Sequence, residues 1–174
     1  MQAIKNYFNS GATKSYEFRK QQLLLLQSTI KKYESEISEA LHQDLGKSKA
    51  EAYTTETGMV LTEIRLMLKD LKKWMQPKSV ATNLMNLPST SKMYYDPLGV
   101  VFIISPWNYP FQLLFTPLIG AIAGGNCAVL KPSEFAPATA AVMGKMIADL
   151  FPNNYMLYLE GEGATVLPPL LTEN

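Results

Sequence analysis

The amino-acid sequence predicts an α/β protein in which N-terminal helices precede the first half of a doubly wound parallel sheet. Two observations lead to this prediction. Residues 1–96 carry fourteen lysines and arginines against ten acidic residues, whereas residues 97–174 carry two against five. In the second part, apolar β-branched runs alternate with helical patterns, as expected for buried strands and the helices that cover them. We therefore divide the chain into a helical segment with its connection, residues 1–96, and a half-sheet, residues 97–174.

The first third of the chain is predicted to be helical. Apolar residues recur every three or four positions between Leu23 and Leu41, which predicts one amphipathic helix that Gly46 ends as a left-handed cap. A second helix is predicted from the apolar face formed by Val60, Ile64, Met67, Leu71 and Trp74, and it ends before Pro77. Residues 78–92 are predicted to be a polar connection, and residues 91–96 a short extended segment without an identifiable partner.

From Gly99 onward the pattern changes to strands and helices in alternation. We expect strands at residues 99–104, 126–131 and 153–161, with the first of them central and covered on both faces. Helices are predicted at residues 111–123 and 137–151, and a weak one at 163–171 because two prolines interrupt it. The order β-α-β-α-β-α with right-handed crossovers predicts a Rossmann-like half-sheet. No later segment covers its apolar edge, so the chain is predicted to stop partway through a domain.

The composition is typical of a soluble globular protein. Of 174 residues, 47% are hydrophobic and 18% charged, and the net charge is +1. This charge gives no field suited to nucleic acid or to an anionic membrane surface. The N-terminal residues lack the apolar core of a signal peptide, which predicts a cytoplasmic location. Residues 97–130 are uncharged, but SPWNYP and a Gly-Gly pair cut them into pieces too short to span a membrane.

Single occurrences of two residue types exclude some classes of site. Cys127 is the one cysteine, so an intrachain disulfide is excluded, and His42 is the one histidine, so we expect no metal site. Cys127 lies inside an apolar strand with no neighbouring base. We interpret it as a small core residue rather than a nucleophile, and His42 as a solvated surface residue.

Two loops follow the first two predicted strands, at the edge of the sheet where ligands of doubly wound proteins collect. SPWNYP follows the first strand, and KPSE follows the second. Lys131 and Glu134 could bind the hydroxyls of a nucleotide ribose, although they could also form an exposed ion pair of little energetic value. A GxGxxG phosphate loop is absent after the first strand, so an ordinary pyrophosphate site is not predicted.

Asn108 raises the sharpest question in this region, because it lies between Trp107 and Tyr109 in an uncharged stretch. An amide in apolar surroundings costs free energy unless it is hydrogen-bonded. One interpretation is a turn-forming asparagine whose side chain caps local backbone. The other is an amide kept available to donate to a ligand. The residues alone leave both open.

The sequence resembles a known family at this point. PLGVVFIISPWNYPFQLLFTPLIGAIAGGNCAVLKPSE, residues 97–134, resembles the first cofactor-binding stretch of the NAD(P)-dependent aldehyde dehydrogenases. FNSGATKSYEFRKQQL, ALHQDLGKSKAEAY and LKKWMQP resemble the class 3 branch of that superfamily. The resemblance implies oxidation of an aldehyde to a carboxylic acid through a cysteine thiohemiacetal and thioester, with NAD or NADP as the electron acceptor.

The resemblance also implies roles for individual residues. Asn108 matches the amide that donates to the oxyanion, and Lys131 and Glu134 match the ribose-binding pair. The remaining matches are two positions beside the adenosine, Ser105 and Trp107, and two positions facing the aldehyde channel, Tyr109 and Leu113. Since Glu134 would repel a 2′-phosphate, NAD is favoured over NADP. The complete protein is expected to be a homo-oligomer, most simply a dimer.

Several parts of the family pattern lie outside the chain: the FTGS-type glycine motif, the segment with the general-base glutamate, and the loop with the nucleophilic cysteine. The resemblance therefore implies the N-terminal part of an aldehyde dehydrogenase, without its catalytic domain and inactive by itself. The alternative is a non-catalytic nucleotide-binding or interaction fragment.

Overall fold

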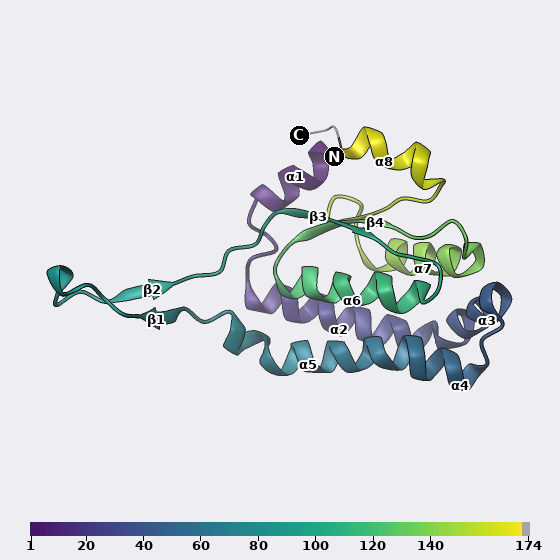
Figure 1. The fold of residues 1–174 in the computed structure, drawn as a ribbon, viewed down its shortest axis with the longest axis horizontal. Helices are drawn as coiled ribbons and strands as arrows, with labels where there is room; N and C mark the ends of the chain where they lie inside the picture. Colours follow the sequence, from purple (N-terminus) through teal and green to yellow (C-terminus); the bar gives the residue numbers. More distant parts are fainter. Residues whose placement is uncertain (172–174) are drawn as a thin grey trace.

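A three-stranded parallel sheet with helices on both sides forms the centre of the protein (Figure 1). The computed structural model describes residues 1–171. The strands lie in the order β3-β4-β5, with the bounds Val100–Ile104, Cys127–Lys131 and Met156–Tyr158. Two helices connect them, α6 (Pro110–Ala123) and α7 (Pro137–Leu150). The α/β fold predicted from the alternating pattern is confirmed.

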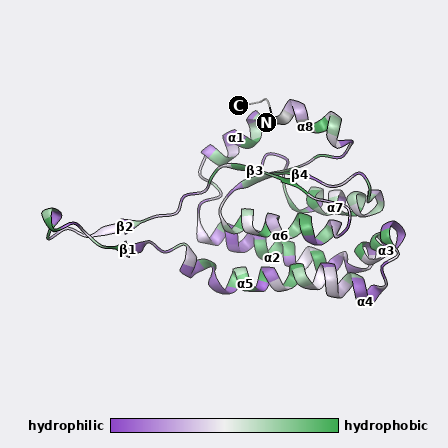
Figure 2. Ribbon diagram, viewed as in Figure 1, coloured by the Kyte–Doolittle hydropathy of each residue, from purple (hydrophilic) through white to green (hydrophobic). Residues whose placement is uncertain are grey.

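The helix α6 lies between the sheet and a further helical layer formed by α2 (Tyr16–Lys32) and α5 (Gly58–Trp74). Because it is covered from both sides, α6 is apolar around most of its circumference. Its fully buried side chains include Phe111, Leu114, Phe115, Leu118, Ile119 and Ile122. Figure 2 shows the same concentration of hydrophobic residues along α6 and the strands β3 and β4. On the other side of the sheet lie α1 (Gln2–Asn9) and α8 (Gly163–Leu171).

The first predicted helix is in fact two helices. Tyr33 has φ −93° and ψ 6°, so it ends α2 and begins α3 (Glu34–Leu45). Its hydroxyl donates a hydrogen bond to Asp149 of α7, and this distant contact explains why periodicity did not predict the break. The apolar positions remain buried on both sides of the break. Gly46 has φ 69° and ends α3 as predicted.

The second predicted helix begins earlier than expected, through α4 (Lys49–Ala52) and a single π-helical turn, η1 (Tyr53–Thr57), that continues into α5. Val60, Ile64 and Leu71 are buried as predicted, but Trp74 is 43% exposed and lies at the rim of a groove. The packing role predicted for Trp74 is therefore wrong.

Residues 78–92 do not form a simple polar connection. β1 (Lys78–Val80) and β2 (Ser91–Met93) pair antiparallel, with Lys78 opposite Met93, and η2 (Leu84–Asn86) lies at the tip. The predicted extended segment at 91–96 thus finds its partner in β1. The hairpin projects from the body of the molecule as an arm (Figure 1).

The strands also differ in burial from the prediction. β4 is buried along its whole length, whereas β3 lies at one side of the three-stranded sheet, with Ile104 54% exposed. The central strand is therefore β4, and the prediction that residues 99–104 form a central strand covered on both faces is wrong. β5 is shorter than the predicted 153–161. The weakly predicted last helix is present as α8 despite Pro168 and Pro169.

Within the described residues, no helix is long and apolar enough to cross a membrane.

Candidate functional site

The pairing of β3 with β4 brings the two predicted ligand loops together. Ile104 lies opposite Lys131, and the backbone N–H of Ser105 donates to the Lys131 carbonyl at 3.0 Å. Both loops therefore start from the same edge of the sheet, as the parallel arrangement requires. The structure places Asn108 in the first loop, three residues after Ser105, and Glu134 in the second.

Asn108 is exposed, and its side-chain amide makes no hydrogen bond to any of the described residues. The helix α6 that follows has Tyr109 at its N-cap and no side-chain capping bond. The structure therefore lacks the local capping bond that would explain Asn108 as a turn residue. Its carbonyl, in contrast, accepts a hydrogen bond from Lys47 Nζ at 3.2 Å. The backbone of this residue is held while its carboxamide stays available to a ligand.

Lys131 and Glu134 form an ion pair in which the lysine is buried and the carboxylate is exposed. The Lys131 side chain is 2% exposed, and its Nζ lies 2.8 Å from Glu134 Oε2. The ammonium also donates to the Pro132 carbonyl at 2.6 Å. Glu134 Oε1 accepts from the backbone N–H of Gly163, at the start of α8, at 3.0 Å. A small pocket of about 190 Å³ adjoins this carboxylate, lined by residues 132–134 and by Pro137, Ala140, Glu160 and Gly161.

Hydrogen bonds to Glu134 strongly favour its charged form. The Gly163 N–H and the Lys131 ammonium lower the pKa of the carboxyl from its ordinary 4.5 to about 2. The group is thus a permanent hydrogen-bond acceptor at neutral pH. An acceptor carboxylate beside a donor ammonium is the arrangement that binds vicinal hydroxyls.

A model of the aldehyde dehydrogenase family matches residues 1–174. The chain belongs to the aldehyde dehydrogenase family. This membership confirms the resemblance inferred from the PWN and KPSE segments.

Individual relatives belong to the class 3 branch, which confirms that part of the resemblance. The chain is 50% identical over 157 residues to 4,4′-diaponeurosporen-aldehyde dehydrogenase of Staphylococcus aureus, covering 90% of this chain and 34% of that protein. It is 44% identical over 158 residues to aldehyde dehydrogenase family 3 member I1, chloroplastic, of Arabidopsis thaliana, covering 91% of this chain and 29% of that protein. The chain thus spans about a third of the length of these relatives and corresponds to their N-terminal portion.

Solved structures share the fold. The substrate-bound state of Staphylococcus aureus AldH matches with a TM-score of 0.90 and 49% identity, over 92% of this chain and 35% of that one. Betaine aldehyde dehydrogenase from Staphylococcus aureus in complex with NAD⁺ matches with a TM-score of 0.79 and 26% identity, over 94% and 32%. A third match is the glyceraldehyde-3-phosphate dehydrogenase GapN of Methanocaldococcus jannaschii, complexed with NADP. It has a TM-score of 0.76 and 20% identity, over 94% of this chain and 36% of that one.

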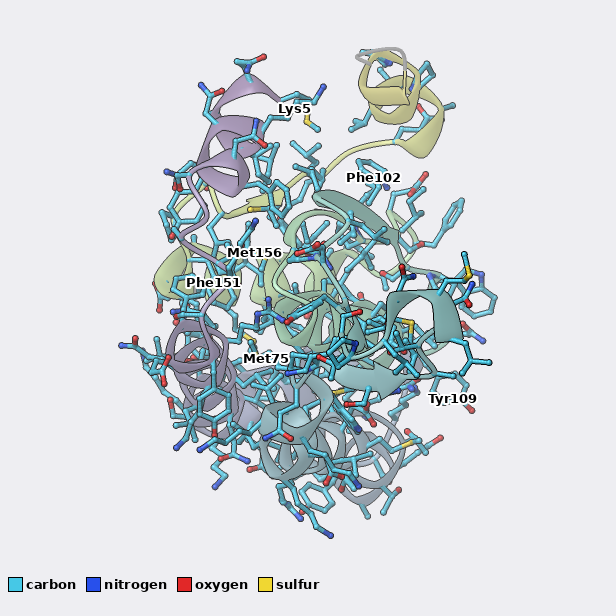
Figure 3. The ribbon with its side chains drawn as sticks, turned by 90° about the vertical axis from the view of Figure 1, so that its left-hand side faces the viewer. Lys5, Met75, Phe102, Tyr109, Phe151 and Met156 are labelled. Carbon is cyan, nitrogen blue, oxygen red and sulfur yellow. The ribbon has the colours of Figure 1, made fainter. Side chains whose placement is uncertain are left out.

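The other predicted site residues of this aldehyde dehydrogenase chain surround the same edge. Ser105 is buried, and its hydroxyl has no hydrogen-bond partner among the described residues. A buried hydroxyl without a partner is uncommon in folded proteins and fits a ligand that supplies one. Trp107 and Tyr109 are exposed, and Leu113 is half-buried on the first turns of α6. Figure 3 shows Tyr109 at the periphery, on the side away from Phe151 and Met156.

Two residues near the site were not predicted from the sequence. Lys47 and Glu56 form a buried ion pair that contacts the backbone around Asn108. The position of Lys47 directly after the helix-ending Gly46 is only a weak sequence signal of a functional role. Nothing in the neighbouring sequence indicates that its ammonium points into the protein. Cys127 is fully buried, which raises the pKa of its thiol to about 11, and His42 is exposed, as predicted.

A larger hollow lies away from this edge of the sheet. A groove of about 820 Å³ lies at the opposite end of the sheet, where Leu98 and Asn126 precede their strands. Ligands of doubly wound sheets bind at the carboxyl ends, so this groove is not the predicted site. Within the described part of the chain, no cluster of His, Cys, Asp and Glu could hold a metal ion.

The low pKa of Glu134 makes a prediction about acid stability. Replacing Glu134 by Gln removes a group whose folded pKa lies below its ordinary 4.5. The stability that this group contributes is fully present above pH 4.5 and is lost as the pH falls toward about 2. Urea unfolding at several pH values should therefore show wild type and Glu134→Gln converging in this window. A carboxyl carbon resonance of Glu134 that titrates near its ordinary value would contradict the arrangement.

Proposed function

We propose that this chain is the N-terminal part of an enzyme that oxidises aldehydes to carboxylic acids with a nicotinamide cofactor. The observation that carries the proposal is the Asn108 carboxamide, exposed at the carboxyl end of β3 without a hydrogen bond to the described residues. The ion pair of buried Lys131 with exposed Glu134 at the neighbouring strand end supports a nucleotide beside it. Membership of the family supplies the reaction class. A cytoplasmic location belongs to the same proposal.

Asn108 supplies the electrophilic part of the chemistry. When a thiolate attacks the aldehyde carbonyl, the new carbon–sulfur bond leaves a negative charge on the carbonyl oxygen. A neutral N–H donor that is already oriented stabilises this charge without reorganising, whereas an aspartate would add a second negative charge. The thiolate belongs to another segment, since Cys127 is buried and its pKa is raised to about 11. We expect the chain alone to show no turnover for this reason.

The cofactor would be held by Lys131, Glu134 and the first loop. The ammonium donates to a ribose hydroxyl and the carboxylate accepts from its neighbour, while the backbone of residues 105–107 lines the adenosine side. The unpartnered Ser105 hydroxyl lies at the same strand end and fits this placement. When bound, the nicotinamide accepts the electrons removed from the aldehyde. Glu134 carries a negative charge at neutral pH and would repel a 2′-phosphate, which favours NAD over NADP.

The aldehyde would approach along the other side of the Asn108 loop. Tyr109 is exposed there, and Leu113 follows it by one helical turn on α6. In the proposal these two side chains line the approach of the aldehyde and exclude water from the reacting carbonyl. Both residues are therefore assigned to aldehyde binding in the proposal.

Loss of the Asn108 amide tests the central role. Replacing Asn108 by Ala in the complete enzyme should lower kcat by about 10²–10³, as removal of one oxyanion donor does in other enzymes. Asn9→Ala is a matched control, because Asn9 is exposed at the end of α1. Steady-state assays of aldehyde-dependent nicotinamide reduction give the comparison. Unchanged turnover of Asn108→Ala, with the fold intact by circular dichroism, would refute the role.

Loss of the Lys131 ammonium tests the cofactor site. A hydrogen bond to a charged group contributes about 1.5–3 kcal/mol, so Lys131→Met in the complete enzyme should weaken NAD binding by about 10- to 100-fold. Lys92→Met, an exposed change in the arm, should leave the dissociation constant unchanged. Titration calorimetry with NAD measures both. Equal affinities of wild type and Lys131→Met would contradict the assignment.

We propose a homodimer for the complete protein, with the β1–β2 arm as part of its interface. Leu84 and Met85 at the tip are 83% and 90% exposed, and clustered exposed apolar side chains mark association surfaces. The two short strands also pair with no third strand among the described residues, which leaves edges open for pairing with a second copy.

The arm makes its own prediction. The double variant Leu84→Ser/Met85→Ser should shift the complete enzyme from dimer toward monomer in sedimentation velocity, because the apolar contact is lost. Leu98→Ser, which changes an exposed leucine outside the arm, is the control. A dimer that persists unchanged in the double variant would contradict the placement of the interface.

A further inference from the structure

A buried lysine lies directly beneath the loop that carries Asn108. Lys47 follows the Gly46 cap of α3, and its side chain is 7% exposed. Its ammonium contacts a carboxylate oxygen of Glu56, the carbonyl oxygen of Asn108 at 3.2 Å, and the face of the Tyr109 ring, with 4.2 Å to the ring centroid. A burial this complete is unusual for lysine and is tolerated because all three contacts are favourable to a cation.

The partner of this lysine holds the next part of the same loop. Glu56 is fully buried, and its second oxygen, Oε2, accepts the backbone N–H of Gln112 at 2.8 Å. Gln112 lies in the first turn of α6, where N–H groups have no partner within the helix. A carboxylate there also interacts favourably with the helix dipole. The pair therefore contacts residues 108 and 109 of the loop and residue 112 in the first turn of α6.

A local irregularity directs Glu56 inward. It lies in the π-helical turn η1, which gives way to α5 at Gly58, whose N–H bonds to the Tyr53 carbonyl. A Cβ at Gly58 would lie 2.6 Å from that carbonyl oxygen, so glycine is required for this turn. Single π-helical turns occur frequently at functional sites. The π-helical turn interrupts the regular α-helical hydrogen-bond pattern. Its structural result is that the carboxylate of Glu56 points into the protein.

We propose that Lys47 and Glu56 are positioning residues that set the orientation of the Asn108 carboxamide for catalysis. The inference rests on the proposed oxyanion role of Asn108. A buried ion pair is a weak stabiliser compared with apolar side chains of similar volume, so folding alone does not account for it. Its two backbone contacts, with the Asn108 carbonyl and the Gln112 N–H, lie at and just after a side chain that has no hydrogen bond to the described residues. The pair fixes the backbone and leaves the amide free.

The test separates positioning from stability by comparing single and double variants of the complete enzyme. Lys47→Met leaves the Glu56 carboxylate buried and unpaired, so it lowers both the melting temperature and kcat. In Lys47→Met/Glu56→Gln no buried charge remains, and the glutamine can still accept the Gln112 N–H. The double variant should therefore recover most of the melting temperature but not kcat.

The expected size of the effect follows from geometry. Misplacing a catalytic group by about 1 Å can cost about 100-fold in rate, so we expect kcat of the double variant to fall by about 10- to 100-fold. The KM for NAD should change by less than about twofold, because the pair does not contact Lys131 or Glu134. Lys145→Met/Glu36→Gln is the matched control, since this is also a Lys–Glu ion pair, 2.8 Å long, but it is solvent-exposed, and the change should leave kcat unchanged.

Two results would overturn the proposal. One is a double variant whose kcat returns to the wild-type value together with its melting temperature, which would make the pair purely structural. The other is an Asn108 side-chain ¹⁵N resonance that stays unchanged between this chain and its double variant. This second measurement needs no activity. If the complete wild-type enzyme oxidises no aldehyde, the proposed function fails, while a shifted Asn108 resonance still supports positioning by the pair.

Discussion

The register between β3 and β4 is the constraint on which the site depends. At the amino end it is fixed by Asn126, whose side chain accepts the Gly99 N–H, and by the Cys127 N–H, which donates to the Gly99 carbonyl. At the carboxyl end the Ser105 N–H extends the pairing to Lys131. A slip by one residue would turn each side chain to the other face of the sheet and separate the two loops. The parallel register therefore starts the loop with the amide and the loop with the charged pair from neighbouring strand ends.

Buried charge concentrates around this edge. Among the described residues, the buried charged side chains are Lys47, Glu56 and Lys131 near the carboxyl ends of the strands, and Arg19 at the opposite end. Each buried lysine meets a carboxylate, and each also donates to a backbone carbonyl, which offsets the cost of desolvation. Lys131 and Glu134 are proposed to serve the cofactor, and Lys47 and Glu56 the amide.

The sequence predicts what depends on local pattern and misses what depends on distant contacts. Apolar β-branched runs identify the strands, and a glycine after a periodic segment identifies the end of α3, because both signals lie within a few residues. The break at Tyr33 depends on Asp149, and the hairpin depends on two short strands separated by a polar stretch, so neither has a local signal. The PWN and KPSE segments indicate Asn108, Lys131 and Glu134. The burial of Lys47 follows from packing that no short segment encodes.

The most direct measurement is a crystal structure of the complete enzyme with a bound nicotinamide cofactor and an aldehyde analogue that forms a tetrahedral adduct. The account predicts that the Asn108 amide nitrogen lies about 3 Å from the adduct oxygen and that the adenosine ribose contacts Lys131 and Glu134. An amide turned onto its own backbone, with the ribose bound elsewhere, would contradict the account.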